Sequence, residues 1–401
     1  MAESVEEFTE RAKAFLDANA SPRVEVGSEW GAGSDDVSLF PESTLEEDLE
    51  NLAKARAWSN RVFDAGFGWI TGPVELGGAG LSRDHENAYR SLEGAYDTPS
   101  RSVYGIGLGM VAPTMLAHGS DVVKAYLPAM HRGDLVGCQL FSEPGAGSDL
   151  ASVQTRAVRD GDEWILNGQK VWTSNAHLAD IGEIVCRTDP DLPKHKGLTA
   201  FMVDMHAPGV EVRPLHQATG GSAFNEVFFT DVRVPDDHRL GDINGGWGVA
   251  LTTLMNERAA IGGGSSGGAM NTDRLIEMAR HFDKADDPIV RDQIVQLAIG
   301  ARIARFTNLR AMARVATGGI PGPEMSLGKM SLTRNLLLLS DLVSSILGNR
   351  LIADTGEWGT FAWSNFVQGV SGMRIAGGSD EVLRNIISER VLGLPKEPVS
   401  R

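Results

Sequence analysis

The sequence predicts an α+β protein that is mostly helical and has three domains. The spacing of apolar residues changes from helical to strand-like near Leu135, and it returns to helical near Gly246. We therefore expect an N-terminal helical domain over 1–130, a central antiparallel β-barrel or sheet domain over 131–243, and a C-terminal four-helix bundle over 244–401. A chain of 401 residues, 42% of them hydrophobic, is long enough to bury more than one core.

The N-terminal part has helical spacing in several segments. Apolar residues recur at three- to four-residue intervals at Val5, Phe8, Ala12 and Phe15. Ser43 and Glu46 fit a capping box ahead of a second helix over 44–65. Helical spacing resumes over 83–93 and 122–130, after a glycine-rich loop.

The central part consists of short β-prone runs separated by turn dipeptides. Asp160-Gly161 and Asn167-Gly168 each predict a tight turn, so we expect two successive hairpins between 152 and 173. Further strands are predicted over 181–187, 198–203, 210–213 and 226–229.

The C-terminal part is helical throughout. Helices are predicted over 249–260, 272–281, 288–316, 325–347 and 381–391. Pro288 suits the first position of its helix, where the missing N–H costs nothing.

The charge balance excludes two classes of partner. The chain has 37 Lys and Arg against 53 Asp and Glu, a formal net charge of −16. Such a chain would repel nucleic-acid phosphates and anionic lipids, so we expect no nucleic-acid binding. The apolar run Leu336–Leu347 is interrupted by four polar residues, which predicts a buried helix and no membrane insertion.

The first residues and the cysteines predict a cytoplasmic protein. Met1–Glu10 contains four glutamates and lacks the basic character of a signal or transit peptide. We expect Cys138 and Cys186 to be free thiols in a reducing compartment.

Two glycine motifs near the start of the C-terminal part are coincidental. Gly262, Gly264 and Gly267 fit G-x-G-x-x-G, and Gly264, Ser266 and Gly268 fit G-x-S-x-G. Both motifs require a preceding strand, whereas this run follows a helical segment. The histidines and cysteines have no zinc-site spacing, so no metal is expected.

Two segments of the central part have the composition of a binding site. The first, Gln139–Leu150, leaves a strand and enters a loop of small residues whose backbone N–H groups could bind a phosphate or a flat polar ring; a plain surface turn is the alternative. The second, Lys170–Asn175, ends a strand with Trp172 beside hydroxyl groups. That Trp is either core or a stacking wall for a flat cofactor.

At these residues the sequence resembles the acyl-CoA dehydrogenase family, and the resemblance covers nearly the whole chain. Four segments resemble family motifs in the family's order: Ser142–Asp149, Asn167–Ser174, Val232–Pro235 and Arg374–Glu381. The last of these is Arg-Ile-Ala-Gly-Gly-Ser-Asp-Glu, the C-terminal signature. The resemblance implies the same helical, β, helical order of domains.

The resemblance implies FAD as cofactor and an acyl-CoA as substrate. Trp172 would cover one flavin face, and Ser174 would hydrogen-bond near its reactive end. The other residues implied to contact FAD are Gln139, Leu140, Phe141, Ser142, Ser148, Ser379 and Glu381. Residues implied to contact the substrate are Ser148, Arg258 and Gly378.

The implied reaction is α,β-dehydrogenation to the trans-2-enoyl-CoA, with the β-hydride passing to flavin N5 and the electrons to an electron-transfer flavoprotein. A desolvated carboxylate removes the α-proton, and the Gly377 N–H with a ribityl hydroxyl stabilises the developing charge on the thioester oxygen. These steps place the protein in fatty-acid β-oxidation and lipid metabolism.

The chain departs from the family at the base. Medium- and short-chain members have the glutamate in the C-terminal signature, where this chain has Gly377. Isovaleryl-CoA and long-chain dehydrogenases have it on a bundle helix before an arginine, as in Glu257-Arg258. We therefore expect Glu257 to be the base, although a solvated glutamate is the plain alternative. By the same resemblance, Arg258 would lie near the CoA thioester or in the bundle core, and a salt-bridging role is the alternative.

A second departure concerns assembly. The Arg-x-Phe-Gly-x-Pro segment, which contacts FAD across the family's dimer, is replaced by Asp283–Pro288, and Arg291 or Gln293 could substitute for it. The actinobacterial-type branch, which this chain resembles, shows such losses. We expect a homodimer or homotetramer. The alternatives are a subunit of an unequal pair with little activity alone, or an oxidase or monooxygenase on the same fold.

Glycines beyond the expected base indicate a roomy acyl pocket. Gly262, Gly263, Gly264, Gly267, Gly268 and Gly377 add little side-chain bulk. We expect a branched or bulky acyl group, and close packing of two helices is the alternative.

Overall fold

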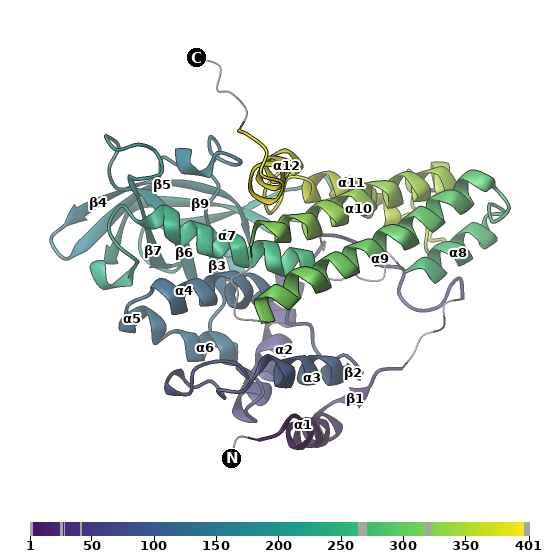
Figure 1. Cartoon of the computed structure of the whole chain (residues 1–401), viewed down its shortest axis with the longest axis horizontal. Coiled ribbons are helices and arrows are strands. Elements are labelled where there is room, and N and C mark those ends of the chain that lie inside the picture. Colours follow the sequence, from purple (N-terminus) through teal and green to yellow (C-terminus); the bar gives the residue numbers. More distant parts are fainter. Residues whose placement is uncertain are drawn as a thin grey trace. The chain divides into compact units, whose positions relative to one another are not determined.

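The computed structural model describes residues 3–24, 27, 29–40, 42–263, 271–316 and 322–396. Its contacts divide the chain into two units, which are described separately (Figure 1). The first unit comprises Met1–Glu25, Ser43–His216 and Ser222–Thr253, and the second comprises Val26–Glu42, Gln217–Gly221 and Leu254–Arg401. Helix α7 (Gly246–Gly263) starts in the first unit and ends in the second.

Helices make up the N-terminal part of the first unit. They are α1 (Val5–Asn19), α2 (Leu45–Asp64), α3 (Arg83–Glu93), α4 (Ala112–His118), α5 (Asp121–Lys124) and α6 (Leu127–Arg132). A small pair of strands, β1 (Ser21–Pro22) and β2 (Tyr96–Asp97), joins the end of α1 to the segment after α3. Phe8, Leu16, Trp58 and Val62 are buried together in a core to which α1, α2 and α3 all contribute.

The predicted cap of α2 is wrong by one residue. Thr44 is the N-cap, its hydroxyl accepts from the Glu47 N–H, and the Glu47 carboxylate accepts from the Thr44 N–H. Ser43 instead donates to Asp48 Oδ1 at 2.6 Å. Ser43 with Glu46 and Thr44 with Glu47 each offer a hydroxyl and a glutamate three residues apart. The sequence alone therefore could not distinguish the two possible caps.

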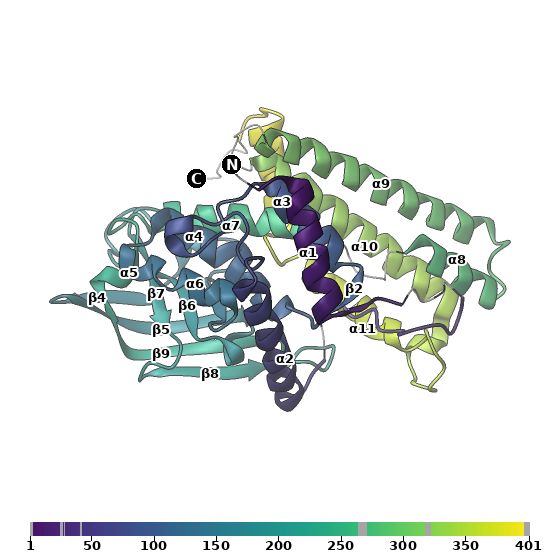
Figure 2. The same ribbon diagram turned by 90° about the horizontal axis from the view of Figure 1, so that it is seen from below.

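In the described part of the chain, eight strands form one mixed, mainly antiparallel sheet. Their order is β10-β7-β6-β4-β5-β9-β8, with β3 paired in parallel to β6. The strands are β3 (Gly137–Leu140), β4 (Arg156–Asp160), β5 (Glu163–Ser174), β6 (Ile181–Arg187), β7 (Leu198–Asp204), β8 (Val210–Leu215), β9 (Phe224–Pro235) and β10 (Arg239–Leu240). Figure 2 shows β5, β9 and β8 running side by side.

One of the two predicted hairpins forms. Asp160 pairs with Glu163 around Gly161, which has φ +65°. At Asn167-Gly168, however, β5 continues without turning and only shifts its register against β9. Gly168 is required there because a Cβ would lie 2.5 Å from Thr155 Oγ1. The dipeptide therefore marks a bulge, the other strand feature that favours glycine.

The second unit is mainly a set of helices. They are the end of α7 with α8 (Thr272–His281), α9 (Pro288–Ala316), α10 (Ser326–Leu347), α11 (Ala362–Met373) and α12 (Asp380–Ile386). The predicted bounds of α8 and α9 are confirmed. Their core includes Leu275, Leu297, Leu339, Trp363 and Phe366.

Helix α10 has the length and composition that could cross a membrane. Much of that apolar surface is already buried within the protein, at Leu336, Leu339, Leu342 and Val343. A buried core helix passes the same test, which agrees with the buried helix predicted from Leu336–Leu347.

Residues 29–40 belong to the second unit although they come from the N-terminal part of the sequence. Trp30 stacks on His281 with ring centroids 5.0 Å apart, and Trp358 Nε1 donates to the Gly33 carbonyl at 2.9 Å. Val37 is buried in the helical core. Aromatic packing therefore holds this segment against the helices.

Candidate functional site

The two segments that the sequence singled out are adjacent in the first unit. Strand β3 ends at Leu140, which is buried together with Phe141, while Gln139 and Ser142 are half-buried. The backbone N–H of Val171 donates to the Ser142 carbonyl at 2.9 Å. The loop after β3 and the end of β5 are thus joined directly.

A buried ion pair fastens this junction. Lys170 Nζ lies 2.8 Å from Glu143 Oε1 and also donates to the carbonyls of Phe141 and Val185. The Glu143 carboxylate accepts from the backbone N–H groups of Gln154 and Thr155. Burial alone would raise the pKa of Glu143, but Lys170 and these donors bring it below its ordinary value.

Trp172 projects from this junction. Its backbone is left-handed, with φ +62°, and its side chain is 56% exposed, whereas Val171 and Thr173 on either side are buried. The ring contacts Phe224 edge to face, with centroids 5.9 Å apart. Ser174 follows at the strand end and is half-buried. Of the two interpretations of this Trp, the exposed ring fits a stacking surface and not a core residue.

The loop within the first segment, after β3, is more closed than the sequence indicated. Glu143 and Ala146 exchange two backbone hydrogen bonds, both 3.0 Å long, so the Ala146 N–H is occupied. Ser148 is exposed, and Asp149 beside it pairs with Lys194. The expected row of free N–H groups is therefore shorter than the composition implied.

The C-terminal signature forms the turn before α12 in the second unit. Gly377 and Gly378 have φ +67° and +90°, which disfavours any side chain at either position. Ser379 is the N-cap of α12 and accepts from the Val382 N–H, while Glu381 is exposed. The positive φ thus favours glycine at position 377, where sequence reasoning noted a missing carboxyl and expected a backbone N–H donor.

Sequence reasoning missed the residues that hold this turn. Lys329, fully buried on α10, donates to the carbonyls of Arg374 and Gly378 and to Asp380 Oδ1. Asp380 also accepts from Thr333 and from Arg374. Burial would raise the pKa of Asp380, but these donors hold it below its ordinary value. The one sequence feature that could have indicated the Lys329–Asp380 pair is the presence of a lysine in the mainly apolar helix α10.

The expected base and its neighbour lie on α7 within the second unit. Glu257 and Arg258 are both half-buried. Among the described residues, Arg258 Nε has no hydrogen-bond partner. Burial lowers the pKa of Arg258, and the neighbouring Glu257 charge opposes that change. Gly264, Gly267 and Gly268 of the expected acyl pocket lie outside the described residues.

The first-unit half of α7 rests on an unusual carboxyl group. Glu183 on β6 is fully buried and accepts from Thr253 Oγ1 at 2.6 Å. The Thr253 and Thr114 hydroxyls lie 2.9 Å apart. Burial raises the pKa of Glu183 to about 8, so at neutral pH it is mainly a neutral acid.

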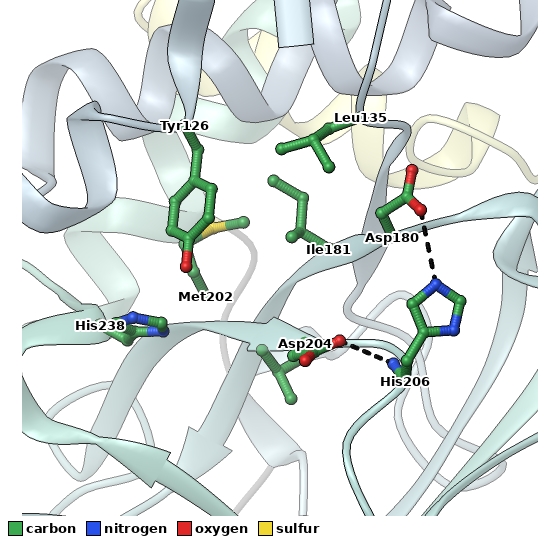
Figure 3. A pocket seen from close by; sticks show the side chains of 9 residues that line it. Tyr126, Leu135, Asp180, Ile181, Met202, Asp204, His206 and His238 are labelled. Atoms are coloured by element: carbon green, nitrogen blue, oxygen red, sulfur yellow. Dashed lines mark hydrogen bonds and ion pairs between the residues drawn. The ribbon is translucent and has the colours of Figure 1, made fainter. Parts of the chain in front are cut away.

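A separate pocket of about 230 Å³ lies beside β6 and β7 in the first unit (Figure 3). Its lining includes Tyr126, Asp180, His206 and His238, and none of the predicted site residues. Asp180 accepts from the Val136 N–H and lies 3.4 Å from His206 Nε2. Asp180 therefore anchors the start of β3, the strand that contains Gln139.

Comparison with known proteins gives consistent matches. The family model described as acyl-CoA dehydrogenase, middle domain, matches residues 138–232, and the one described as acyl-CoA dehydrogenase, C-terminal domain, matches 244–392. Acyl-CoA dehydrogenase IpdE1 of Mycobacterium tuberculosis is 37% identical over 87% of this chain and 90% of its own.

Solved structures agree over the whole chain. The Tcur3481-Tcur3483 steroid ACAD has a TM-score of 0.74 at 26% identity, with 98% of both chains covered. The ChsE4-ChsE5 complex from Mycobacterium tuberculosis has a TM-score of 0.71 at 25% identity, again over 98% of both chains.

Proposed function

The chain belongs to the acyl-CoA dehydrogenase family, a family of oxidoreductases, and on that premise we propose that it converts an acyl-CoA to the trans-2-enoyl-CoA with FAD. The observation that carries the proposal is Trp172. Its ring is exposed on a left-handed backbone beside the Glu143–Lys170 pair, which fits a wall for a flat cofactor. FAD, when bound, supplies the acceptor for the β-hydrogen and its electron pair.

The first-unit residues would bind and orient the flavin. Trp172 would stack on one face of the ring and exclude water from it. Ser174, at the end of the same strand, would donate its hydroxyl to the ring's polar edge. The buried Lys170–Glu143 pair would keep Trp172 and Ser174 at a fixed distance from the loop that starts at Ser142.

The second-unit residues would act on the α-proton. Glu257 is the carboxylate that we assign as the base, because the left-handed backbone at Gly377 accommodates only glycine readily. The Gly377 N–H would stabilise negative charge on the thioester oxygen. Arg258, whose Nε has no partner among the described residues, has a donor available for the substrate.

A base substitution tests this function. Glu257→Gln should retain FAD and acyl-CoA binding and slow flavin reduction by about 10²- to 10⁴-fold, because loss of a general base commonly costs that much. The readout is anaerobic bleaching of the flavin band by stopped flow. Glu277→Gln on α8, which removes one carboxylate paired with Arg280, is the matched control and should reduce at the normal rate. If flavin reduction in Glu257→Gln were as fast as in the wild type, Glu257 would not be the base.

We propose a bulky or branched acyl group as the substrate. Gly377 and Gly378 add no side chains at the turn before α12, and one structural relative is a steroid ACAD. A panel of straight, branched and ring-bearing acyl-CoAs would rank kcat/KM. Turnover of straight short chains alone would contradict this choice.

We propose that the working protein is an assembly and that it passes electrons to an electron-transfer flavoprotein. Helix α9 has an exposed apolar stripe formed by Val295, Ile299, Ile303, Phe306 and Leu309. Such a stripe fits a second subunit, either another copy or a different chain, and the structural relative ChsE4-ChsE5 is itself a complex.

The segment Asp283–Pro288 leads into α9 and offers no arginine to a neighbour's cofactor. Asp287 Oδ1 accepts from the Ile289 N–H, which is a capping role. Of the two candidate substitutes, Arg291 is exposed, whereas Gln293 is half-buried. We therefore assign any cross-subunit contact to Arg291.

A further inference from the structure

A chain of hydrogen bonds leads from helix α2 to the end of β5, entirely within the first unit. Asp48 Oδ2 lies 3.0 Å from His177 Nε2, and His177 Nδ1 lies 3.1 Å from Asn225 Nδ2. Asn225 Nδ2 also donates to the Thr173 carbonyl at 3.2 Å. Asp48 is on α2, His177 is in the short turn Ala176–Leu178, and Asn225 is on β9. Two distant segments, α2 and β9, and the turn just after β5 therefore converge on Thr173, the residue that follows Trp172.

The donors and acceptors of this chain have one consistent arrangement. If the Asn225 amide were reversed, its oxygen would face the Thr173 carbonyl oxygen, and two acceptors would meet. The amide nitrogen therefore faces both Thr173 and His177, so His177 Nδ1 is an acceptor without a proton. The ring proton is then on Nε2 and is donated to the Asp48 carboxylate. Asp48 thus fixes the tautomer that Asn225 requires.

The Thr173 carbonyl is the point where β5 needs support. The register of β5 against β9 shifts between Lys170 and Thr173, and Trp172 within the shift has φ +62°. A left-handed backbone at a non-glycine residue is unfavourable, so neighbouring contacts must maintain it. The exposed Trp172 ring has little packing that could do so. Asn225 and Thr173, in contrast, are both buried and directly opposite each other in the sheet.

The contact acts on the backbone and not on the Thr173 side chain. The Thr173 hydroxyl is buried and has no hydrogen-bond partner among the described residues. Two residues later, the Asn175 N–H donates to the Ala223 carbonyl at 3.0 Å, which fixes the far side of Ser174. The Asn225 bond therefore holds the Thr173–Ser174 peptide group, next to Trp172 and Ser174, the two residues proposed to contact the flavin.

We propose that Asp48, His177 and Asn225 are positioning residues that hold Trp172 and Ser174 in the orientation that binds the flavin. The proposal rests on the proposed function above for the identity of the ligand. None of the three contacts the ligand itself; they act through the Thr173 carbonyl. Figure 2 shows α2, which contributes Asp48, beside the ends of β8 and β9.

Two pairs of variants test this role. Asn225→Asp keeps the shape but removes the donor to Thr173, and Asp48→Ala removes the acceptor of His177 together with the acceptor of the Ser43 hydroxyl. Asp48→Asn is the conservative variant, since its amide oxygen can still accept from Nε2. Asn167→Ala is the matched control, because Asn167 bonds to Asp231 at the other, exposed bulge of the same strand pair.

Two readouts separate positioning from general stability. In the apo protein, amide hydrogen exchange over 172–176 should accelerate about 10-fold in Asn225→Asp and Asp48→Ala, as expected for the loss of one net hydrogen bond. FAD affinity should weaken about 5- to 10-fold and kcat should fall, with KM for the acyl-CoA within twofold. Asp48→Asn and Asn167→Ala should match the wild type.

The proposal would be overturned if amide hydrogen exchange over 172–176 and FAD affinity both stayed at wild-type values in Asn225→Asp and in Asp48→Ala. Faster exchange with unchanged FAD affinity would also overturn it, because the backbone would then be held for another purpose. If the wild-type protein binds no flavin, the proposed function fails, and the exchange data still decide whether the three residues hold the Trp172 backbone.

Discussion

Lys170 Nζ lies 2.8 Å from Glu143 Oε1, and the lysine side chain has no exposed surface. The ammonium group has three N–H donors, and it has three acceptors: Glu143 and the carbonyls of Phe141 and Val185. A buried charge is tolerated only when it is paired and hydrogen-bonded in this way. The pair joins the loop after β3 to the strand that presents Trp172.

Breaking this pair should destabilise the protein strongly. In Lys170→Met the Glu143 carboxylate remains buried without its counter-ion, which typically costs about 3–5 kcal/mol. Urea denaturation of the apo protein would measure the change in the free energy of unfolding. Lys194→Met is the control, because its partner Asp149 is exposed and such pairs contribute about 0–1 kcal/mol. Equal losses in the two variants would show that the buried pair has no special role.

The buried acid Glu183 should make stability fall as pH rises. Its folded pKa, raised by burial to about 8, exceeds the unfolded value near 4.5, so the folded state binds the extra proton. Its stabilising contribution is fully present below the unfolded pKa and is lost as pH rises to about 8. Relative to Glu183→Gln, the wild type should lose roughly 4 kcal/mol between pH 5 and pH 8. Parallel stability–pH curves for the two proteins would contradict this prediction.

Asp380 should have the opposite pH dependence. Its folded pKa is lowered, so the stability it contributes is present above its ordinary pKa and is lost as pH falls through the folded value. Asp380→Ala at neutral pH leaves Lys329 buried without its carboxylate, and we expect a loss of about 3–5 kcal/mol in urea denaturation. Asp354→Ala, at an exposed position, should change stability by less than about 0.5 kcal/mol. A small effect at Asp380 would mean that Arg374 and Gly378 carbonyls alone satisfy Lys329.

The α9 stripe should be buried in the assembled protein. Phe306→Glu places a charge in the middle of an apolar surface, so we expect dissociation to a smaller species in sedimentation velocity. Ile352→Glu is the control, because Ile352 is exposed and lies outside α9. Identical sedimentation of the wild type and Phe306→Glu would place the subunit contact elsewhere.

Local signals predicted the elements well. Helix α9 begins at Pro288 and α8 covers 272–281, as their apolar spacing indicated, because helix periodicity is recorded within a few turns of chain. Asn167-Gly168 was misinterpreted because a bulge and a hairpin turn favour the same dipeptide, and only the partner strand distinguishes them.

The site was predictable as a set of segments and not as a set of contacts. The residues around Trp172 stood out because an aromatic residue and hydroxyls end a strand. Lys170 and Glu143 are 27 residues apart, and Lys329 and Asp380 are 51 apart, so no spacing rule joins them. The left-handed backbone of Trp172 depends on Asn225 across the sheet and could not be inferred from the sequence.

The backbone of Trp172 also affects how a ligand would meet this surface. The contacts that turn the ring outward are all within the protein, so the surface is formed when the chain folds and before any ligand arrives. The conformational entropy of ordering it is lost during folding and does not reduce the affinity of the later encounter. A flat ligand would therefore associate with a rigid, prearranged surface, at a rate limited by collision and orientation and not by rearrangement of the strand.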